Sequence, residues 1–187
     1  MLDWEELKEK CFACTQCGLC ETRRNVVFGV GNMNADIMFI GEGPGEQEDI
    51  QGVPFVGPAG KLLDDMLSII DLNRENCYIA NIVKCRPPGN RDPQEDEQIA
   101  CIGYLRNQVS LVQPRIIICL GRVAAKRIID PDFRITREHG TWIHRSGIWM
   151  TALYHPSALL RDVSKRPETF EDLIAIREKI CELGIMI

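Results

Sequence analysis

Two continuous apolar runs constrain the fold more than any other feature: ADIMFIG at residues 35–41 and RIIICLG at residues 115–121. A strand with one face in water alternates apolar and polar side chains, whereas a strand buried on both faces is apolar throughout. Strands of the second kind are typical of parallel sheets that helices cover on both sides. The two runs therefore predict an α/β domain with a mainly parallel sheet.

Four apolar segments are predicted to form the strands of this sheet: 35–40, 77–83, 116–120 and 148–154. Helical patterns lie between them. KLLDDMLSII at 61–70 places five apolar side chains on one face. Asp92, Pro93 and Glu95 read as the N-cap and first turn of a helix that should run to about Leu111. Two more helices are expected at 121–129 and 168–183, so strands alternate with helices in a layered α/β domain.

We expect one domain over residues 1–187, because the chain is long enough for a substantial core and no linker or repeat divides it. Its start, MLDWEELKEK, is too polar for a signal peptide, and no apolar run approaches a membrane span. These features predict a cytoplasmic protein that does not contact a membrane.

The unusual residues follow directly after the predicted strands. GEGPG at 41–45 follows the first strand, the segment from Asn81 to Arg91 follows the second, Gly121 follows the third and His155 the last. The carboxyl ends of parallel strands share one edge of a sheet, where ligands bind. We therefore expect these four segments to converge on one crevice.

Residues 41–60 form a segment rich in Gly and Pro, which is predicted to be a functional loop of about twenty residues. It does not match a phosphate-binding loop. A Walker A motif ending at Lys61 would need Gly in place of Phe55 and Ser or Thr in place of Leu62, and the GEGPG glycines lack the Rossmann spacing. A nucleotide cofactor is therefore not expected.

Nine cysteines in a chain without an export signal indicate metal ligation rather than disulfides. Cys11, Cys14, Cys17 and Cys20 are spaced like a ferredoxin run, but the closing three-residue gap and proline of such runs are missing. Four thiolates also suit zinc. From spacing alone, an electron-transfer cluster, a zinc site and a structural cluster all remain open.

The net charge of −5 argues against broad nonspecific binding to nucleic acid. Basic residues nevertheless gather in two loops, and from charge alone these loops are open to two interpretations, a phosphate-facing rim or a solvated mixed surface. One loop carries Lys84, Arg86 and Arg91, and the other carries Arg161, Lys165 and Arg166.

Several long motifs resemble the family 4 uracil-DNA glycosylases, the iron–sulfur branch of the uracil-DNA glycosylase superfamily. The matching stretches are GEGPG at 41–45, GVPFVGPAG at 52–60, YIANIVKCRPPGNR at 78–91 and HPSALL at 155–160, with C-x-L-x3-R at 17–23. The resemblance implies a three-layer sandwich around a four-stranded sheet. It also implies a monofunctional enzyme that flips uracil out of DNA and hydrolyses its N-glycosidic bond, leaving an abasic site in base excision repair.

The resemblance further implies roles for residues of the crevice. Phe55 would stack on the uracil, Gly43 would line its pocket and Asn81 would bind the uracil O4 and N3–H. His155 would hydrogen-bond the uracil O2 as negative charge develops there.

Two further groups would act on the attacking water or the sugar. Glu42, the only carboxylate in the GEGPG turn, would orient the water or stabilise the cationic sugar, and Asn90 would help to hold the water. DNA contacts are expected from Lys84, Arg86, Arg91, Ser157, Leu159 and Arg161, with Leu159 or Leu160 as an apolar wedge.

The family match selects Cys14, Cys17, Cys85 and Cys101 as ligands of a [4Fe-4S] cluster, which would be a structural staple because hydrolysis moves no electrons. Cys11 and Cys20 would then be spare thiols, while Cys77, Cys119 and Cys181 are expected in the core. The expected partner is uracil-containing DNA, single- or double-stranded, bound by a monomer. The rival readings are an electron-transfer module and a DNA-binding module without catalysis.

Overall fold

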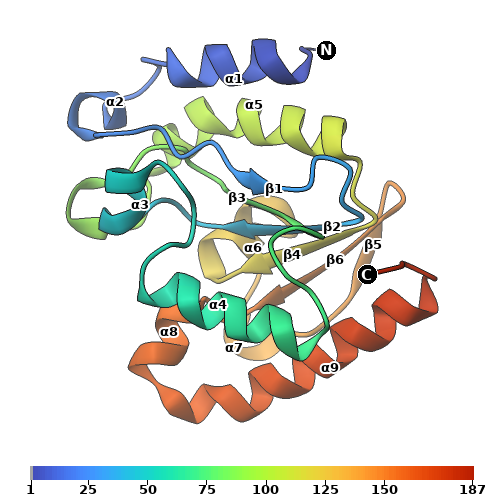
Figure 1. Cartoon of the computed structure of the whole chain (residues 1–187). Coiled ribbons are helices and arrows are strands. Elements are labelled where there is room, and N and C mark those ends of the chain that lie inside the picture. The colour runs from blue at the N-terminus through green and yellow to red at the C-terminus, as the bar shows by residue number, and fades with distance from the viewer. Residues whose placement is uncertain (1) are drawn as a thin grey trace.

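A six-stranded sheet lies at the centre of the computed structural model, which describes residues 2–187 (Figure 1). Its strand order is β1-β3-β2-β4-β6-β5. The four inner strands are parallel: β2 (Ile37–Gly41), β3 (Tyr78–Asn81), β4 (Ile116–Leu120) and β6 (Ile148–Leu153). Two short strands, β1 (Val30–Gly31) and β5 (Ile143–Arg145), pair antiparallel at the edges.

The four predicted strands are therefore confirmed as the parallel part of the sheet, whereas the expected number of strands is wrong. β1 has two residues and β5 has three. Segments this short carry no periodicity that a sequence pattern could reveal. β5 is joined to β6 by a tight turn at Ser146 and Gly147, both of which have positive φ angles.

Helices cover both faces of the sheet and complete the three-layer sandwich (Figure 1). One core cluster joins the sheet to α1 (Trp4–Phe12), α5 (Glu95–Val112) and α6 (Arg122–Ile128). The other joins it to α4 (Pro58–Ile69), α8 (Pro156–Arg161) and α9 (Arg166–Glu182). Within β2, Met38 and Ile40 belong to the first cluster while Ile37 and Phe39 belong to the second, as expected for a strand buried on both faces.

The remaining elements are short. They are α2 (Leu19–Thr22), α3 (Glu46–Gln51), α7 (Ile135–Glu138) and 3-10 turns at Pro88–Asn90 and Val163–Lys165. In the part of the chain that the structure describes, no helix is both long enough and apolar enough to cross a membrane.

Helix α5 begins two residues later than predicted. Its N-cap is Gln94, whose main-chain N–H donates to Glu97 Oε2 at 2.7 Å, so this pair forms the capping box. Asp92, the predicted N-cap, instead forms an ion pair with Arg122 at the start of α6. The predicted cap signal at Asp92 is therefore not the one that the structure uses.

The predicted twenty-residue loop at 41–60 is also more ordered than expected. It contains α3, and α4 already begins at Pro58, one residue after its N-cap Gly57. Asp49 in α3 is buried and its carboxylate accepts the main-chain N–H of Arg24 at 2.9 Å, which ties this segment to the N-terminal part of the chain.

Candidate active site

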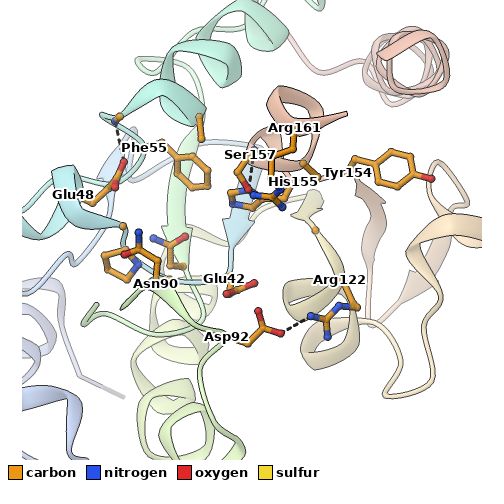
Figure 2. Close-up of a pocket in the computed structure, with 18 of the residues that line it drawn as sticks. Glu42, Glu48, Phe55, Asn90, Asp92, Arg122, Tyr154, His155, Ser157 and Arg161 are labelled. Carbon is orange, nitrogen blue, oxygen red and sulfur yellow. Dashed lines mark hydrogen bonds and ion pairs between the residues drawn. The ribbon is translucent and has the colours of Figure 1, made fainter. Parts of the chain in front are cut away.

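A cavity of about 750 Å³ opens at the carboxyl ends of the parallel strands (Figure 2). All four segments predicted to meet there contribute to its lining. Among the residues that line it are Glu42, Gly43, Phe55, Asn81, Asn90, Gly121 and His155. The prediction of a shared crevice is confirmed.

Phe55 lies in this cavity with a strained backbone. Its φ angle is 54°, in the left-handed region that side chains other than Gly rarely adopt, and only 5% of its surface is exposed. The next two main-chain N–H groups donate to Glu48 Oε1 at 2.9 and 3.0 Å. Arg74 donates to the carbonyl of Phe55 and to the preceding carbonyl. A Cβ at Gly60 would lie 1.8 Å from the Phe55 carbonyl oxygen, so only Gly fits there.

Asn81 ends β3 beside Phe55 and presents an unpaired acceptor. The residue is 2% exposed, and its Oδ1 has no hydrogen-bond partner among residues 2–187. A Cβ at Gly41 would lie 2.4 Å from this oxygen and 2.6 Å from Phe55 Cζ, so glycine at position 41 keeps the two side chains in place. A buried acceptor without a partner costs free energy unless a ligand satisfies it.

His155 follows β6 and forms the N-cap of α8. Its Nδ1 accepts the main-chain N–H of Ser157 at 3.1 Å and lies 2.7 Å from the Ser157 hydroxyl (Figure 2). Because Nδ1 is an acceptor, the proton of the neutral ring is on Nε2. Burial, and then the charge of Arg161, lower the pKa of His155 to about 4, so the ring is neutral at physiological pH. The rings of His155 and Phe55 are 5.7 Å apart between centroids.

Glu42 faces the same cavity from the end of β2. Burial, followed by the charge of Asp92, raises its pKa to about 7, while Arg122 and Arg161 oppose the rise. Asp92 and Arg122 form an ion pair beside Glu42 (Figure 2). A carboxyl group with a pKa near neutrality suits proton transfer or the activation of water.

The loop after β3 carries Asn90, Arg86 and Arg91, of which Asn90 and Arg91 line the cavity. Arg86 Nε donates to Asn90 Oδ1 at 2.7 Å and the Arg86 guanidinium lies 3.6 Å from a carboxylate oxygen of Glu46. Arg91 holds both carboxylate oxygens of Glu97 at 2.6 and 2.8 Å. The polar groups of all three side chains are engaged within the protein, and their contacts with DNA or water stay predictions.

Two of the predicted DNA contacts are wrong. Lys84 is only 1% exposed, so its ammonium group cannot reach a phosphate. Leu159 is 2% exposed and packs in the core against α4 and α9, so it cannot wedge into a base stack. Its neighbour Leu160 is 42% exposed and stays available as the wedge. Ser157 and Arg161 line the cavity and stay available as DNA contacts.

A second, small cavity gathers six cysteines between the N-terminal segment and the loop after β3. Its lining contains Cys11, Cys14, Cys17, Cys20, Cys85 and Cys101. The ferredoxin-like run and the set implied by the family match therefore meet at the same place. Cys77 and Cys119 are buried in the core as predicted, but Cys181 is exposed, so its expected place in the core is wrong.

Two positively charged residues contact the thiols of this second cavity. Arg23 Nη1 donates to Cys85 Sγ at 3.2 Å, and the main-chain N–H of Lys84 donates to Cys101 Sγ at 3.3 Å. Burial raises the pKa of Cys101 to about 11, and Lys84 opposes this. Residues 2–187 contain no three His, Cys, Asp or Glu side chains placed to hold a single metal ion. A four-iron cluster holds its thiolates further apart than one ion does, and a donor set made only of thiols fits such a cluster.

Sequence reasoning gave no role in the site to three residues that shape it: Arg74, Asp92 and Arg122. Arg122 follows Gly121 directly after β4, so the rule that ligands bind at strand ends was the signal for it. Asp92 had been assigned to a helix cap. Arg74 lies in a loop far from any motif, and nothing in the sequence indicated that it contacts the backbone of Phe55.

Comparison with known proteins gives a consistent assignment. The family model of the uracil DNA glycosylase superfamily matches residues 28–176. A type-4 uracil-DNA glycosylase of Archaeoglobus fulgidus is 43% identical over an alignment that covers 96% of this chain and 92% of the relative. Type-4 uracil-DNA glycosylases of Sulfurisphaera tokodaii and Thermotoga maritima are 44% and 43% identical, over 93% and 86% of this chain and 83% and 84% of the relatives.

These relatives align along nearly the full length of the chain, and the family model spans the sheet and the four segments that line the cavity. The chain belongs to the uracil-DNA glycosylase superfamily and, within it, to the type-4 uracil-DNA glycosylases, enzymes that cleave the N-glycosidic bond of uracil in DNA.

Proposed function

We propose that the cavity at the carboxyl ends of the strands receives a uracil flipped out of DNA, and that Phe55, Asn81 and His155 recognise it and promote its release. The observation that carries this proposal is the unpaired Oδ1 of Asn81, buried at the cavity beside the ring of Phe55. A base in a duplex is unreachable, so a glycosylase must extrude it into a pocket of this kind.

Recognition rests on the edge of the base. The Asn81 amide offers one acceptor and one donor side by side, which match the N3–H and O4 of uracil. Cytosine carries an amino group in place of O4 and would oppose the amide donor with another donor. Phe55 supplies a flat apolar surface for the face of the base, and Gly43 leaves room beside it. A Cβ at Gly43 would lie 2.7 Å from Val83 Cγ2.

Cleavage puts negative charge on the departing uracil and positive charge on the sugar. His155 would donate its Nε2–H to the uracil O2, the atom at which the anion develops. Its tautomer supports this role, because Nδ1 is occupied by the N–H of Ser157 and the ring is neutral. A preorganised neutral donor needs no proton transfer before the bond breaks.

Glu42 would act on the other product of cleavage. As a carboxylate it would stabilise the cationic sugar and orient the attacking water, and Asn90 would help to hold that water. The raised pKa of Glu42 leaves a substantial fraction of the carboxyl ionised near neutral pH.

DNA would lie across the rim of the cavity. The side chains proposed to contact it are Arg86, Arg91, Ser157, Leu160 and Arg161. The arginines would position the phosphates, while Leu160 would fill the gap left by the flipped base. The substrate is uracil-containing DNA, single- or double-stranded, bound by one copy of the chain.

The cysteine cavity would hold a [4Fe-4S] cluster on Cys14, Cys17, Cys85 and Cys101. When bound, the cluster would supply a cross-link between the N-terminal segment and the loop after β3, since glycosidic hydrolysis transfers no electrons. Support comes from the all-thiol donor set and from the N–H groups of Arg23 and Lys84 on two of the sulfurs.

The proposal is tested with uracil-containing oligonucleotides treated with alkali after incubation, for the wild type and for Asn81→Ala and His155→Ala. The wild type should give strand breaks at uracil alone, and each variant should be slowed about a hundredfold or more. His144→Ala, at an exposed histidine on β5, is the matched control. The visible absorption of the cluster should stay unchanged in all three variants. An electron-transfer module or a silent DNA-binding module would produce no breaks, and wild-type rates in either site variant would refute the assigned roles.

A further inference from the structure

Lys84 is the most deeply buried lysine or arginine among residues 2–187. It lies three residues after Asn81 and is 1% exposed. Its ammonium donates to the carbonyl oxygen of Asn81 at 3.0 Å and to Gln108 Oε1 at 2.6 Å. Both acceptors are neutral oxygen atoms. Burying an ammonium without a carboxylate partner costs free energy. The burial of Lys84 therefore indicates that its position serves a role in the fold or the site.

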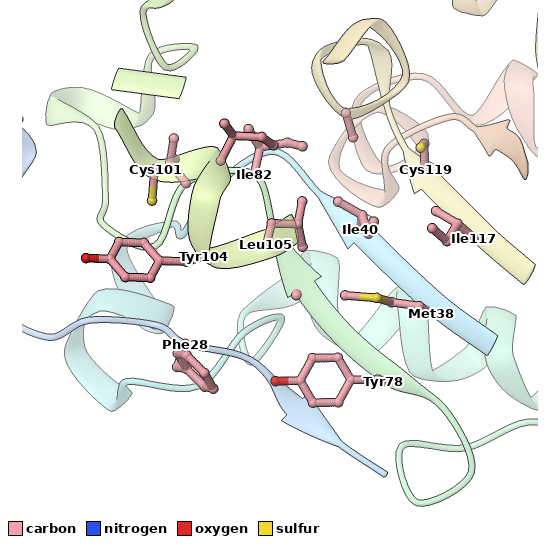
Figure 3. Close-up of a cluster of buried hydrophobic side chains, with 14 of the residues drawn as sticks. Phe28, Met38, Ile40, Tyr78, Ile82, Cys101, Tyr104, Leu105, Ile117 and Cys119 are labelled. Atoms are coloured by element: carbon pink, nitrogen blue, oxygen red, sulfur yellow. The ribbon is translucent and has the colours of Figure 1, made fainter. Parts of the chain in front are cut away.

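Gln108 is itself fixed, which makes it a rigid anchor for Lys84. Its Nε2 donates to the Phe28 carbonyl at 2.9 Å and to the Tyr78 hydroxyl at 3.1 Å. Figure 3 shows Phe28 and Tyr78 close to each other beneath α5. Because both hydrogens of the Gln108 amide face these acceptors, its Oε1 must point at Lys84.

Lys84 is also held at its main chain, by a cysteine of the second cavity. The main-chain N–H of Lys84 donates to Cys101 Sγ, and Cys101 stands two helical turns before Gln108 on α5. One face of α5 therefore binds Lys84 at its backbone and at its side chain. A set of thiolates on a cluster would also carry negative charge close to this ammonium, which would offset the cost of burying it.

Asn81 is the residue on which this anchor acts. It is the last residue of β3, paired with Gly41 in β2, and its amide opens onto the cavity. Just after β3, the main-chain N–H groups of Ile82 and Val83 donate to the carbonyls of Gly41 and Glu42, while the carbonyl of Asn81 itself accepts from the Lys84 ammonium. We propose that Lys84 is a positioning residue for base recognition, which ties the end of β3 to Cys101 and Gln108 of α5 and so fixes the direction of the Asn81 amide.

This inference rests on the proposed role of Asn81 in reading uracil, and its test separates the two. The variant is Lys84→Met, of similar length but without charge, in the protein with its cluster. Free uracil is the probe, used as a product inhibitor of the glycosylase. We expect inhibition by uracil to weaken about tenfold, the effect of one charge-assisted hydrogen bond. The visible absorption should persist, because the bond from the main chain to Cys101 remains. Lys126→Met, at an exposed lysine of α6, is the matched control.

The double variant Asn81→Ala, Lys84→Met decides the mechanism. If Lys84 acts through the Asn81 amide, the double variant should bind uracil no more weakly than Asn81→Ala alone. The inference is overturned if uracil inhibits the double variant more weakly than it inhibits Asn81→Ala. It is also overturned if inhibition of Lys84→Met is unchanged. Unchanged inhibition in Asn81→Ala instead removes the proposed role of Asn81. If Lys84→Met fails to fold, Gln108→Met must weaken uracil inhibition by removing the other acceptor, and a normal value there also overturns the inference.

Discussion

Replacing Arg74 by alanine should weaken the proposed uracil pocket by loosening the backbone of Phe55. Arg74 is absent from the cavity lining, yet its guanidinium donates to the carbonyl before Phe55 at 3.0 Å and to that of Phe55 itself. Its Nε also holds Asp64 at 2.7 Å. Phe55 needs such support, since a left-handed conformation costs an L-residue about 1–2 kcal/mol.

The size of the effect follows from these contacts. Hydrogen bonds from a charged donor contribute about 1.5–3 kcal/mol each. The Arg74 side chain is 26% exposed, so water replaces part of what is lost, and we expect Arg74→Ala to lower the free energy of unfolding by about 2 kcal/mol. Stacking of a base on an aromatic ring is worth about 1–3 kcal/mol. A turn relaxed enough to lose half of that stacking lowers kcat/KM on single-stranded uracil DNA by about twofold to tenfold.

Urea unfolding and single-turnover cleavage measure the two effects. Asp64→Asn is the control, because it removes only a half-exposed ion pair and should change stability by less than about 0.5 kcal/mol. Arg74→Lys should recover little, since a single ammonium lacks the planar fork of donors with which the guanidinium reaches Asp64 and the two carbonyls at once. A full cleavage rate in a destabilised Arg74→Ala would refute the reasoning, and would mean that Glu48 and Gly60 hold Phe55 without help.

Three further results are expected. The cleavage rate should rise as pH increases through about 7, because the Glu42 carboxyl, whose pKa burial raises, becomes a carboxylate; a Glu42→Gln profile that keeps this rise would assign it to another group. Cys85→Ser should lose iron and thermal stability while Cys181→Ser, at an exposed thiol, keeps both, and normal iron content in Cys85→Ser would exclude it as a ligand. Leu160→Ala should slow cleavage of duplex DNA more than of single strands, whereas Leu159→Ala should cost about 2–4 kcal/mol of stability; equal slowing on both substrates in Leu160→Ala would argue against a wedge.

The parallel core of the sheet was predictable because burial on both faces leaves a mark on the sequence itself. β4 was predicted to its residue bounds, since Arg115 and Gly121 end an unbroken apolar run. The edge strands left no such mark, because β1 and β5 are short and half open to solvent. The start of α5 was misplaced for a different reason: Asp92 is a good N-cap in isolation, and only its ion pair with Arg122 shows why Gln94 takes that role.

The composition of the cavity was predictable for a topological reason. Parallel strands bring their carboxyl ends together, so residues 42, 81 and 155 had to meet whatever their side chains. The direction of each side chain was beyond the sequence. HPSALL reads equally well with either leucine outward, and the helical turn that begins at Pro156 buries Leu159 and exposes Leu160.

Lys84 shows where charge in a sequence misleads. Next to Arg86 and Arg91 it reads as part of a phosphate-binding cluster, because lysine is almost never fully buried. Burial becomes possible here because two neutral oxygens accept from the ammonium and the thiols of the second cavity lie close by. Two of these partners are remote in sequence, since Gln108 is two dozen positions away and Cys101 seventeen. Lys84 lies between the asparagine proposed to read the base and a cysteine proposed to hold the cluster, and its burial favours a role as a brace between these two residues over a contact with DNA.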